Sequence, residues 1–153
     1  KTLFMQAVIK VNKTRLKYLI RKITQVLGPI SGKRIGLLGL TYKPGTDTLR
    51  RSMSLELAKK LHKNKARILA YDPVIKTFIK GYEFIDIKIN LNDFLKDIDI
   101  AVLMTEWPQF KEEKVLEMMS LMKNKVIIDT KNFLDKDRYE DSGFNIIRIG
   151  EGK

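Results

Sequence analysis

The sequence predicts an α/β protein: a Rossmann-like, three-layer domain with a mostly parallel sheet, preceded by one long helix. Four short apolar segments, rich in β-branched residues, alternate with segments of helical periodicity. Such alternation is typical of parallel strands that helices cover on both faces. The first apolar segment also runs into a polar loop punctuated by Gly and Pro, as expected where a buried strand ends.

The first predicted element is a helix over about residues 3–27, where apolar residues recur at spacings of three and four. Gly28-Pro29 should end it, because Gly favours helix exit and Pro cannot continue the helix. The apolar stripe is broader than one edge of a small domain needs, which predicts that a partner buries its middle, at Leu16 and Ile20. The stripe comprises Ala7, Val11, Leu16, Ile20, Ile23 and Leu27. We therefore divide the chain into a helical unit, residues 1–28, and an α/β domain, residues 29–153.

The remaining elements follow in order along the chain. Buried strands are expected over about residues 34–40, 66–71, 98–104 and 125–129, with short strands at 83–87 and 144–148 that would widen the sheet. Helices are expected over about residues 52–64, 91–96 and 111–123.

Composition limits the classes of function. With 153 residues, 44% hydrophobic and 31% charged, the chain resembles one globular domain with a sizeable core. No apolar run approaches the ~18 residues that span a bilayer, so we expect no membrane partner. The absence of cysteine excludes disulfides and thiolate chemistry and is compatible with a cytoplasmic protein. The single histidine, His62, lies among lysines, so we expect no metal site.

The formal net charge of +12 raises the question of nucleic acid. The first 46 residues contain ten Lys or Arg and no acid, and Lys10, Lys13, Lys17 and Arg21 could follow a phosphate backbone from one helix face. No nucleic-acid-binding motif accompanies them, and few aromatic residues lie between the cations. A solvated face, or a surface that meets an acidic partner, is the favoured interpretation.

The loop after the first strand predicts an anion site. It carries Lys43 and Arg50, and a helix should begin near Ser52, so that two cations and backbone N–H groups can meet phosphate oxygens. The sequence from Gly36 to Gly39 lacks the complete Gly-x-Gly-x-x-Gly of a dinucleotide site. Asp72 ends the second strand about 33 residues after Gly39, where a ribose-binding acid would follow after about 20. We therefore favour an Asp-Pro turn for Asp72.

The amino-acid sequence of this loop says more about the ligand than its charge does. Residues 39–52, Gly-Leu-Thr-Tyr-Lys-Pro-Gly-Thr-Asp-Thr-Leu-Arg-Arg-Ser, resemble the signature loop of the UDP-glucose/GDP-mannose dehydrogenase family, in its C-terminal, nucleotide-sugar-binding domain. Residues 105–110, Thr-Glu-Trp-Pro-Gln-Phe, resemble the family's Thr-Glu-Trp-x-x-Phe segment, in the form shown by members that act on UDP-glucose. Residues 129–132, Asp-Thr-Lys-Asn, resemble its Asp-x-Arg-Asn turn. Residues 7–12 and 71–73 match further segments in the family's order.

This resemblance implies roles for four residues. Tyr42 and Lys43 would contact the nucleotide sugar, and Arg50 would contact NAD bound to the other domain of the enzyme. Lys131 stands in place of the family's Arg, which keeps the charge but loses bidentate geometry. Arg51 stands where the family usually has Glu.

The resemblance also implies a reaction. The family oxidises a sugar C6 hydroxyl to a carboxylate in two NAD-dependent hydride transfers through a thiohemiacetal, which needs a thiolate. We therefore expect the C-terminal part of such an enzyme, without catalytic residues of its own, that binds a UDP-sugar, contacts an N-terminal NAD-binding domain and forms a homodimer through residues 1–28. The alternative is a stand-alone basic module that binds a nucleotide or nucleic acid without catalysis.

Overall fold

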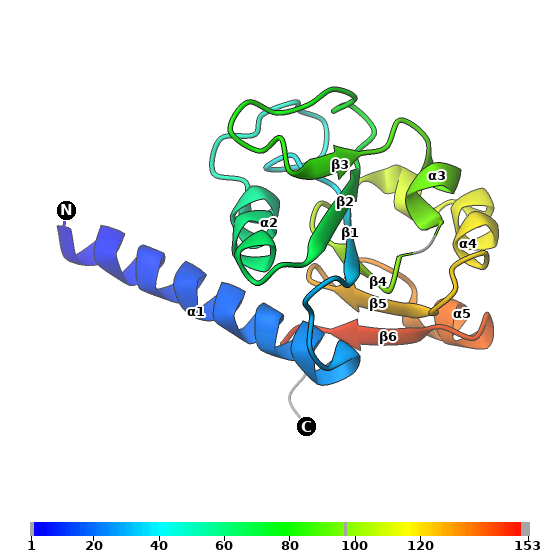
Figure 1. Cartoon of the computed structure of the whole chain (residues 1–153). Coiled ribbons are helices and arrows are strands. Elements are labelled where there is room, and N and C mark those ends of the chain that lie inside the picture. Colours follow the sequence, from blue (N-terminus) through cyan, green and yellow to red (C-terminus); the bar gives the residue numbers. More distant parts are fainter. Residues whose placement is uncertain (1, 97, 151–153) are drawn as a thin grey trace.

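Six parallel strands form one sheet in the order β3-β2-β1-β4-β5-β6 in a computed structural model that describes residues 2–96 and 98–150. The predicted α/β, Rossmann-like fold is confirmed (Figure 1). The strands are β1 (Arg34–Leu38), β2 (Arg67–Tyr71), β3 (Ile85–Ile87), β4 (Ile100–Leu103), β5 (Val126–Asp129) and β6 (Asn145–Arg148).

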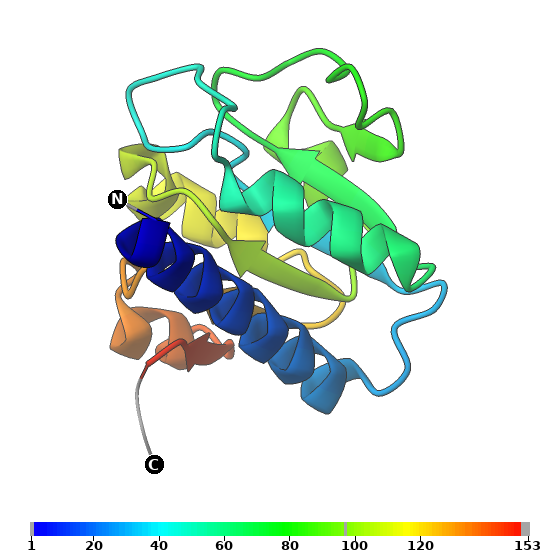
Figure 2. The same cartoon turned by 90° about the vertical axis from the view of Figure 1, so that its left-hand side faces the viewer.

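Helices cover both faces of the sheet, as crossovers between parallel strands require. Helices α1 and α2 lie on one face, and α3, α4 and α5 lie on the other (Figures 1 and 2). The helices are α1 (Thr2–Leu27), α2 (Met53–Lys63), α3 (Leu91–Leu95), α4 (Glu113–Met119) and α5 (Lys136–Asp141), with a 3-10 turn η1 (Pro108–Lys111) before α4.

Several predicted boundaries differ from the structure, and two of these differences have local reasons. Strand β1 ends at Leu38 because Gly39 takes a positive φ of 92°, which no regular strand accommodates. The helix expected over residues 111–123 is shorter, since η1 begins at Pro108 and α4 spans only Glu113–Met119. Helix α5 was not predicted, because Tyr139 is the only large apolar residue in its sequence, Lys-Asp-Arg-Tyr-Glu-Asp.

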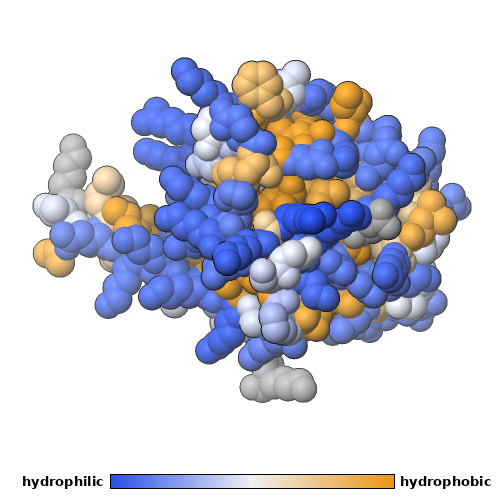
Figure 3. All heavy atoms as spheres, viewed as in Figure 1, coloured by the Kyte–Doolittle hydropathy of each residue, from blue (hydrophilic) through white to orange (hydrophobic). Residues whose placement is uncertain are grey.

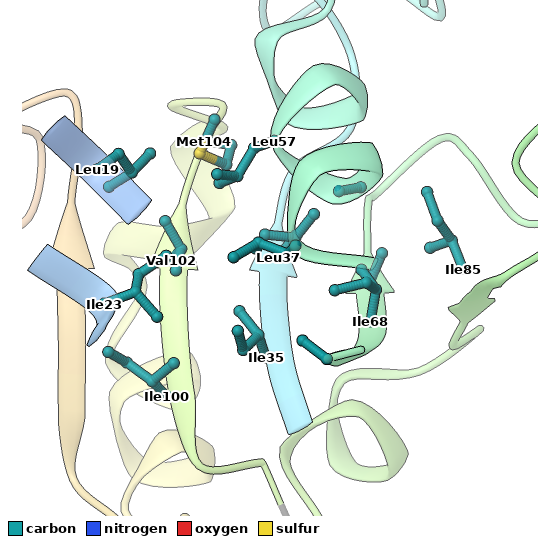
Figure 4. Packing of buried hydrophobic residues seen from close by; sticks show 14 of the residues in the cluster. Leu19, Ile23, Ile35, Leu37, Leu57, Ile68, Ile85, Ile100, Val102 and Met104 are labelled. Atoms are coloured by element: carbon teal, nitrogen blue, oxygen red, sulfur yellow. The ribbon is translucent and has the colours of Figure 1, made fainter. Parts of the chain in front are cut away.

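Helix α1 packs on the sheet with its second half only. Leu16, Leu19 and Ile23 are buried, at the spacings of three and four that define one helix face. Figure 4 shows Leu19 and Ile23 facing Val102 and Ile100 of β4. The expectation that a partner would bury Leu16 was wrong: this domain's own core covers it completely, and Ile20 packs partly against the same core.

The first half of α1 projects beyond the sheet (Figure 1). Its projecting end carries apolar as well as hydrophilic side chains (Figure 3). The large apolar side chains exposed in this half are Leu3, Phe4, Met5, Val8, Ile9 and Val11. The helix ends as predicted, at Leu27, where Gly28 has a φ of 71° and donates its N–H to the Thr24 carbonyl at 2.8 Å.

Candidate functional site

The candidate site lies at the carboxyl edge of the sheet, around the loop that joins β1 to α2. Strands β1 and β4 are neighbours at the centre of the sheet, and the chain continues from them toward opposite edges. Open parallel sheets bind ligands at this kind of topological switch point. A ligand at this edge would therefore meet the loops that follow β1, β4 and β5.

Side chains at the start of α2 hold the first residues of the β1–α2 loop. The hydroxyl of Ser54 donates to the Gly39 carbonyl at 2.8 Å, and that of Ser52 donates to the Leu40 carbonyl at 2.6 Å. Ser52 also caps α2 by accepting the N–H of Leu55, so the helix begins where it was predicted. The start of the loop is consequently fixed to the start of α2.

The middle of the loop extends toward solvent. The N–H of Tyr42 donates to the Thr48 carbonyl at 2.8 Å, which closes residues 42–48 into a compact turn. Tyr42 is 54% exposed, and Lys43 and Arg50 are exposed as well. Three of the four predicted site residues thus lie on one accessible loop at the expected edge of the sheet.

A pocket of about 80 Å³ lies between α1, this loop and the end of β5. It brings together Tyr42 and Lys131, which are 89 residues apart in the chain. Lys43 and Arg50 do not line it, whereas Arg51, the departure from the family pattern, does. Its walls are Arg15, Leu19, Thr41, Tyr42, Arg51, Met53, Ser54, Met104, Thr130, Lys131 and Ile149.

Three cations from three elements therefore border one small pocket. Arg15 of α1 donates from Nη2 to the Thr130 carbonyl at 3.1 Å, which ties the helix to the loop after β5. Arg51 has a φ of 63°, a left-handed conformation that is uncommon for residues other than Gly. Sequence analysis missed Arg15, because only the packing of α1 on the sheet brings it to this edge.

Lys131 belongs to the predicted Asp-x-Lys-Asn turn, which the structure forms. The carboxylate of Asp129 accepts the backbone N–H groups of Lys131 at 2.9 Å and of Phe133 and Leu134 at 2.8 Å each. The ammonium of Lys131 lies 3.5 Å from Glu106 Oε2. Sequence analysis did not identify this ion pair, although β4 and β5 are adjacent and pair Leu103 with Asp129, so that the residues just after them meet.

Trp107 and Phe110 are packing residues and not an exposed stacking platform. Trp107 is 5% exposed and Phe110 is 1% exposed, and both belong to the core beneath α3 and α4. An open hollow lies between the loops after β1 and β4, at the switch point itself. It is lined by Pro44, Gly45, Trp107, Pro108, Gln109 and Glu112.

The turn interpretation of Asp72 is also confirmed. Asp72 is fully buried, and its Oδ1 accepts the N–H groups of Val74 at 2.9 Å and Ile75 at 3.2 Å. Burial, followed by the negative charge of Asp72, raises the pKa of the adjacent Tyr71. A carboxylate enclosed in this way cannot reach the ribose of a bound nucleotide.

The described residues carry neither a metal-binding cluster nor a membrane-spanning helix. Among residues 2–96 and 98–150, no cluster of three or more His, Cys, Asp or Glu side chains could hold a metal ion. In the same part of the chain, no helix is long and apolar enough to cross a membrane.

Comparison with known proteins agrees with the sequence motifs. Residues 36–136 match the UDP-glucose/GDP-mannose dehydrogenase family, UDP binding domain. A UDP-glucose 6-dehydrogenase of Rickettsia conorii is 37% identical over 153 residues, which is 95% of this chain and 35% of that protein. UDP-glucose 6-dehydrogenase TuaD of Bacillus subtilis is 29% identical over 149 residues, 95% of this chain and 32% of that protein. The chain spans about a third of the length of these relatives.

Solved structures show the same fold. A UDP-glucose dehydrogenase from Pyrobaculum islandicum superposes with a TM-score of 0.70 at 24% identity, over 95% of this chain and 31% of that one. A UDP-D-ManNAc dehydrogenase from Pyrococcus horikoshii superposes with a TM-score of 0.68 at 26% identity, over 92% of this chain and 31% of that one. Because residues 36–136 match it, this chain belongs to the UDP-glucose/GDP-mannose dehydrogenase family and contains its UDP binding domain.

Proposed function

We propose that this chain forms the UDP-sugar-binding side of an NAD-dependent UDP-glucose 6-dehydrogenase. The observation that carries the proposal is the β1–α2 loop, which presents Tyr42 and Lys43 at the switch point of a UDP binding domain. In this proposal Tyr42 and Lys43 contact the nucleotide sugar directly. Lys131 contributes positive charge from the neighbouring pocket.

NAD does not fit this chain as a complete site. The turn after β1 has no Gly-x-Gly-x-x-Gly, and the backbone N–H groups of Leu40 and Thr41, which a pyrophosphate would need, already donate to Asp72. We therefore propose that another part of a longer protein holds the cofactor. Arg50, exposed at the end of the same loop, supplies one contact to the NAD pyrophosphate.

The same reasoning predicts that this chain is inactive alone. Oxidation of an alcohol to a carboxylate through a thiohemiacetal needs a cysteine thiolate, and the sequence has no cysteine. NADH formation from UDP-glucose by the pure chain would contradict this. The first half of α1 would contact either the preceding part of the longer protein or a second copy, as its exposed apolar side chains suggest.

Isothermal titration calorimetry of the chain with UDP, UDP-glucose and GDP-mannose tests the binding role. We expect the uridine ligands to bind and Lys43→Ala to weaken them, because a charge-assisted contact contributes about 1.5–3 kcal/mol, or roughly 10- to 150-fold in affinity. Lys59→Ala, on the exposed face of α2, is the matched control and should bind as the wild type does. Equal binding by both variants would remove Lys43 from the site.

The alternative, a basic module without catalysis, makes a different prediction. Such a module would bind a single-stranded oligonucleotide through the cations of α1 and lose that affinity steeply with salt. The proposed dehydrogenase role predicts that UDP-glucose outcompetes the oligonucleotide at moderate salt.

A further inference from the structure

Asp72 does more than shape its own turn. Its second oxygen, Oδ2, accepts the N–H groups of Leu40 at 2.7 Å and Thr41 at 3.2 Å, and the indole Nε1–H of Trp107 at 3.3 Å. With Val74 and Ile75 on Oδ1, one buried carboxylate accepts five hydrogen bonds. The donors come from the loops after β1, β2 and β4.

This arrangement suits an ionised carboxylate and no other side chain. A carboxylate offers about four lone-pair sites and no donor, so the five N–H groups meet no competing donor, and three of them share the two lone pairs of Oδ2. An asparagine would direct its own NH₂ group at some of the same donors. Burial of the charge is tolerated only because hydrogen bonds surround it.

The two residues that precede Tyr42 are held on both sides. Leu40 donates its N–H to Asp72 and accepts from Ser52, while Thr41 donates to Asp72 and accepts from the Thr105 hydroxyl at 2.8 Å. Every backbone polar group of this pair therefore has a partner from another segment. The direction in which the chain enters the Tyr42–Lys43 turn depends on those partners.

We propose that Asp72 is a positioning residue for the nucleotide-sugar site. Its carboxylate locks the start of the loop that carries Tyr42 and Lys43 to Trp107, which lines the hollow on the other side of the switch point. Asp72 does not touch the ligand. The identity of the ligand in this proposal rests on the proposed function. The connection that Asp72 makes between the two loops, which we call the lock, rests on the hydrogen bonds alone.

Asp99 provides a matched control at the opposite edge of the sheet. Its Oδ2 accepts the Arg34 N–H at 2.8 Å, so it also joins two neighbouring strands through a carboxylate. It lies at the amino ends of β1 and β4, away from the three loops. Loss of either carboxylate should lower stability, but only loss of Asp72 should release the loop.

The test compares Asp72→Asn with Asp99→Asn in the 153-residue chain, at a temperature where circular dichroism shows both folded. Hydrogen exchange of peptides from residues 40–48 should be at least tenfold faster in Asp72→Asn and within twofold of wild type in Asp99→Asn. The dissociation constant for UDP should rise at least tenfold in Asp72→Asn and less than twofold in Asp99→Asn. Trp107, the only tryptophan, should shift its fluorescence in Asp72→Asn alone.

The proposal would be overturned if the two variants showed the same hydrogen exchange of residues 40–48, or the same dissociation constant for UDP. Should Asp72→Asn fail to fold, Trp107→Phe removes a single donor from the carboxylate while keeping an aromatic ring in the core. It should speed exchange of residues 40–48 severalfold, and unchanged exchange would overturn the lock. A wild-type chain that does not bind UDP would refute the proposed function instead, and the exchange comparison would then decide the lock by itself.

Discussion

Replacing Gly39 by Ala should destabilise this protein more than the same change at its other loop glycines. A Cβ at Gly39 would lie 2.4 Å from Thr105 Cβ and 2.9 Å from the Thr105 backbone nitrogen, and its φ is 92°. The positive φ costs Ala roughly 1–2 kcal/mol, and overpacking against a fixed neighbour costs about 1–3 kcal/mol. The free energy of unfolding should therefore fall by about 2–5 kcal/mol, which for a domain of this size lowers the melting temperature by roughly 4–20 °C.

Two glycines separate the contributions. Gly45→Ala introduces the backbone strain alone, since Gly45 has a φ of 77° and no described residue has an atom within 4 Å of the added Cβ. Gly36→Ala introduces the steric clash alone. The added Cβ would lie 2.7 Å from Phe94 Cζ, the far end of a side chain, and the φ of Gly36 is not positive. Urea denaturation should rank the losses with Gly39→Ala largest. If Gly39→Ala costs no more than Gly45→Ala, the close approach of the loop to Thr105 is not the constraint we describe.

Three further predictions concern the cofactor, α1 and pH. In the proposed longer enzyme, Arg50→Ala should raise the Michaelis constant for NAD and leave that for UDP-glucose unchanged. Steady-state kinetics showing a raised Michaelis constant for UDP-glucose alone would mean that Arg50 faces the sugar and not the cofactor. The chain should self-associate at ~100 μM through the exposed half of α1 when nothing else covers it, and Val11→Glu should abolish this in sedimentation equilibrium, whereas a monomeric wild type would refute the contact. Burial raises the pKa of Tyr139 to about 12 from 10.0, so its contribution to stability is complete below pH 10 and is lost as pH rises from 10 to 12. Between pH 9 and pH 11.5 that loss is about 2 kcal/mol, and Tyr139→Phe should lack it in urea denaturation at these two pH values.

Much of the fold follows from local sequence. The apolar segments around Ile35, Ile68, Val102 and Ile128 became the four central strands, because a strand buried on both faces must be apolar throughout. Gly28-Pro29 ended α1, since these residues restrict the backbone regardless of distant contacts. The sequence also placed Lys43 and Arg50 on the loop after the first strand, where the structure has them.

Local sequence was insufficient where a long-range contact decides. The periodicity of α1 placed Leu16 on the apolar face of the helix. Whether the protein's own sheet or a partner covers Leu16 depends on where the helix packs. In the same way, Lys131 meets Glu106 only because β4 and β5 are neighbours in the sheet.

Asp72 shows most clearly which features the sequence determines and which the tertiary structure determines. Its sequence neighbours, Tyr71 and Pro73, were enough to indicate a turn at the end of a strand. Its other three hydrogen-bond donors lie 31 to 35 residues away along the chain, at Leu40, Thr41 and Trp107. The sequence by itself determined the strands, the basic loop and the family; only the tertiary structure decided which side chains hold that loop, because a buried carboxylate must collect its donors from whatever segments fold around it.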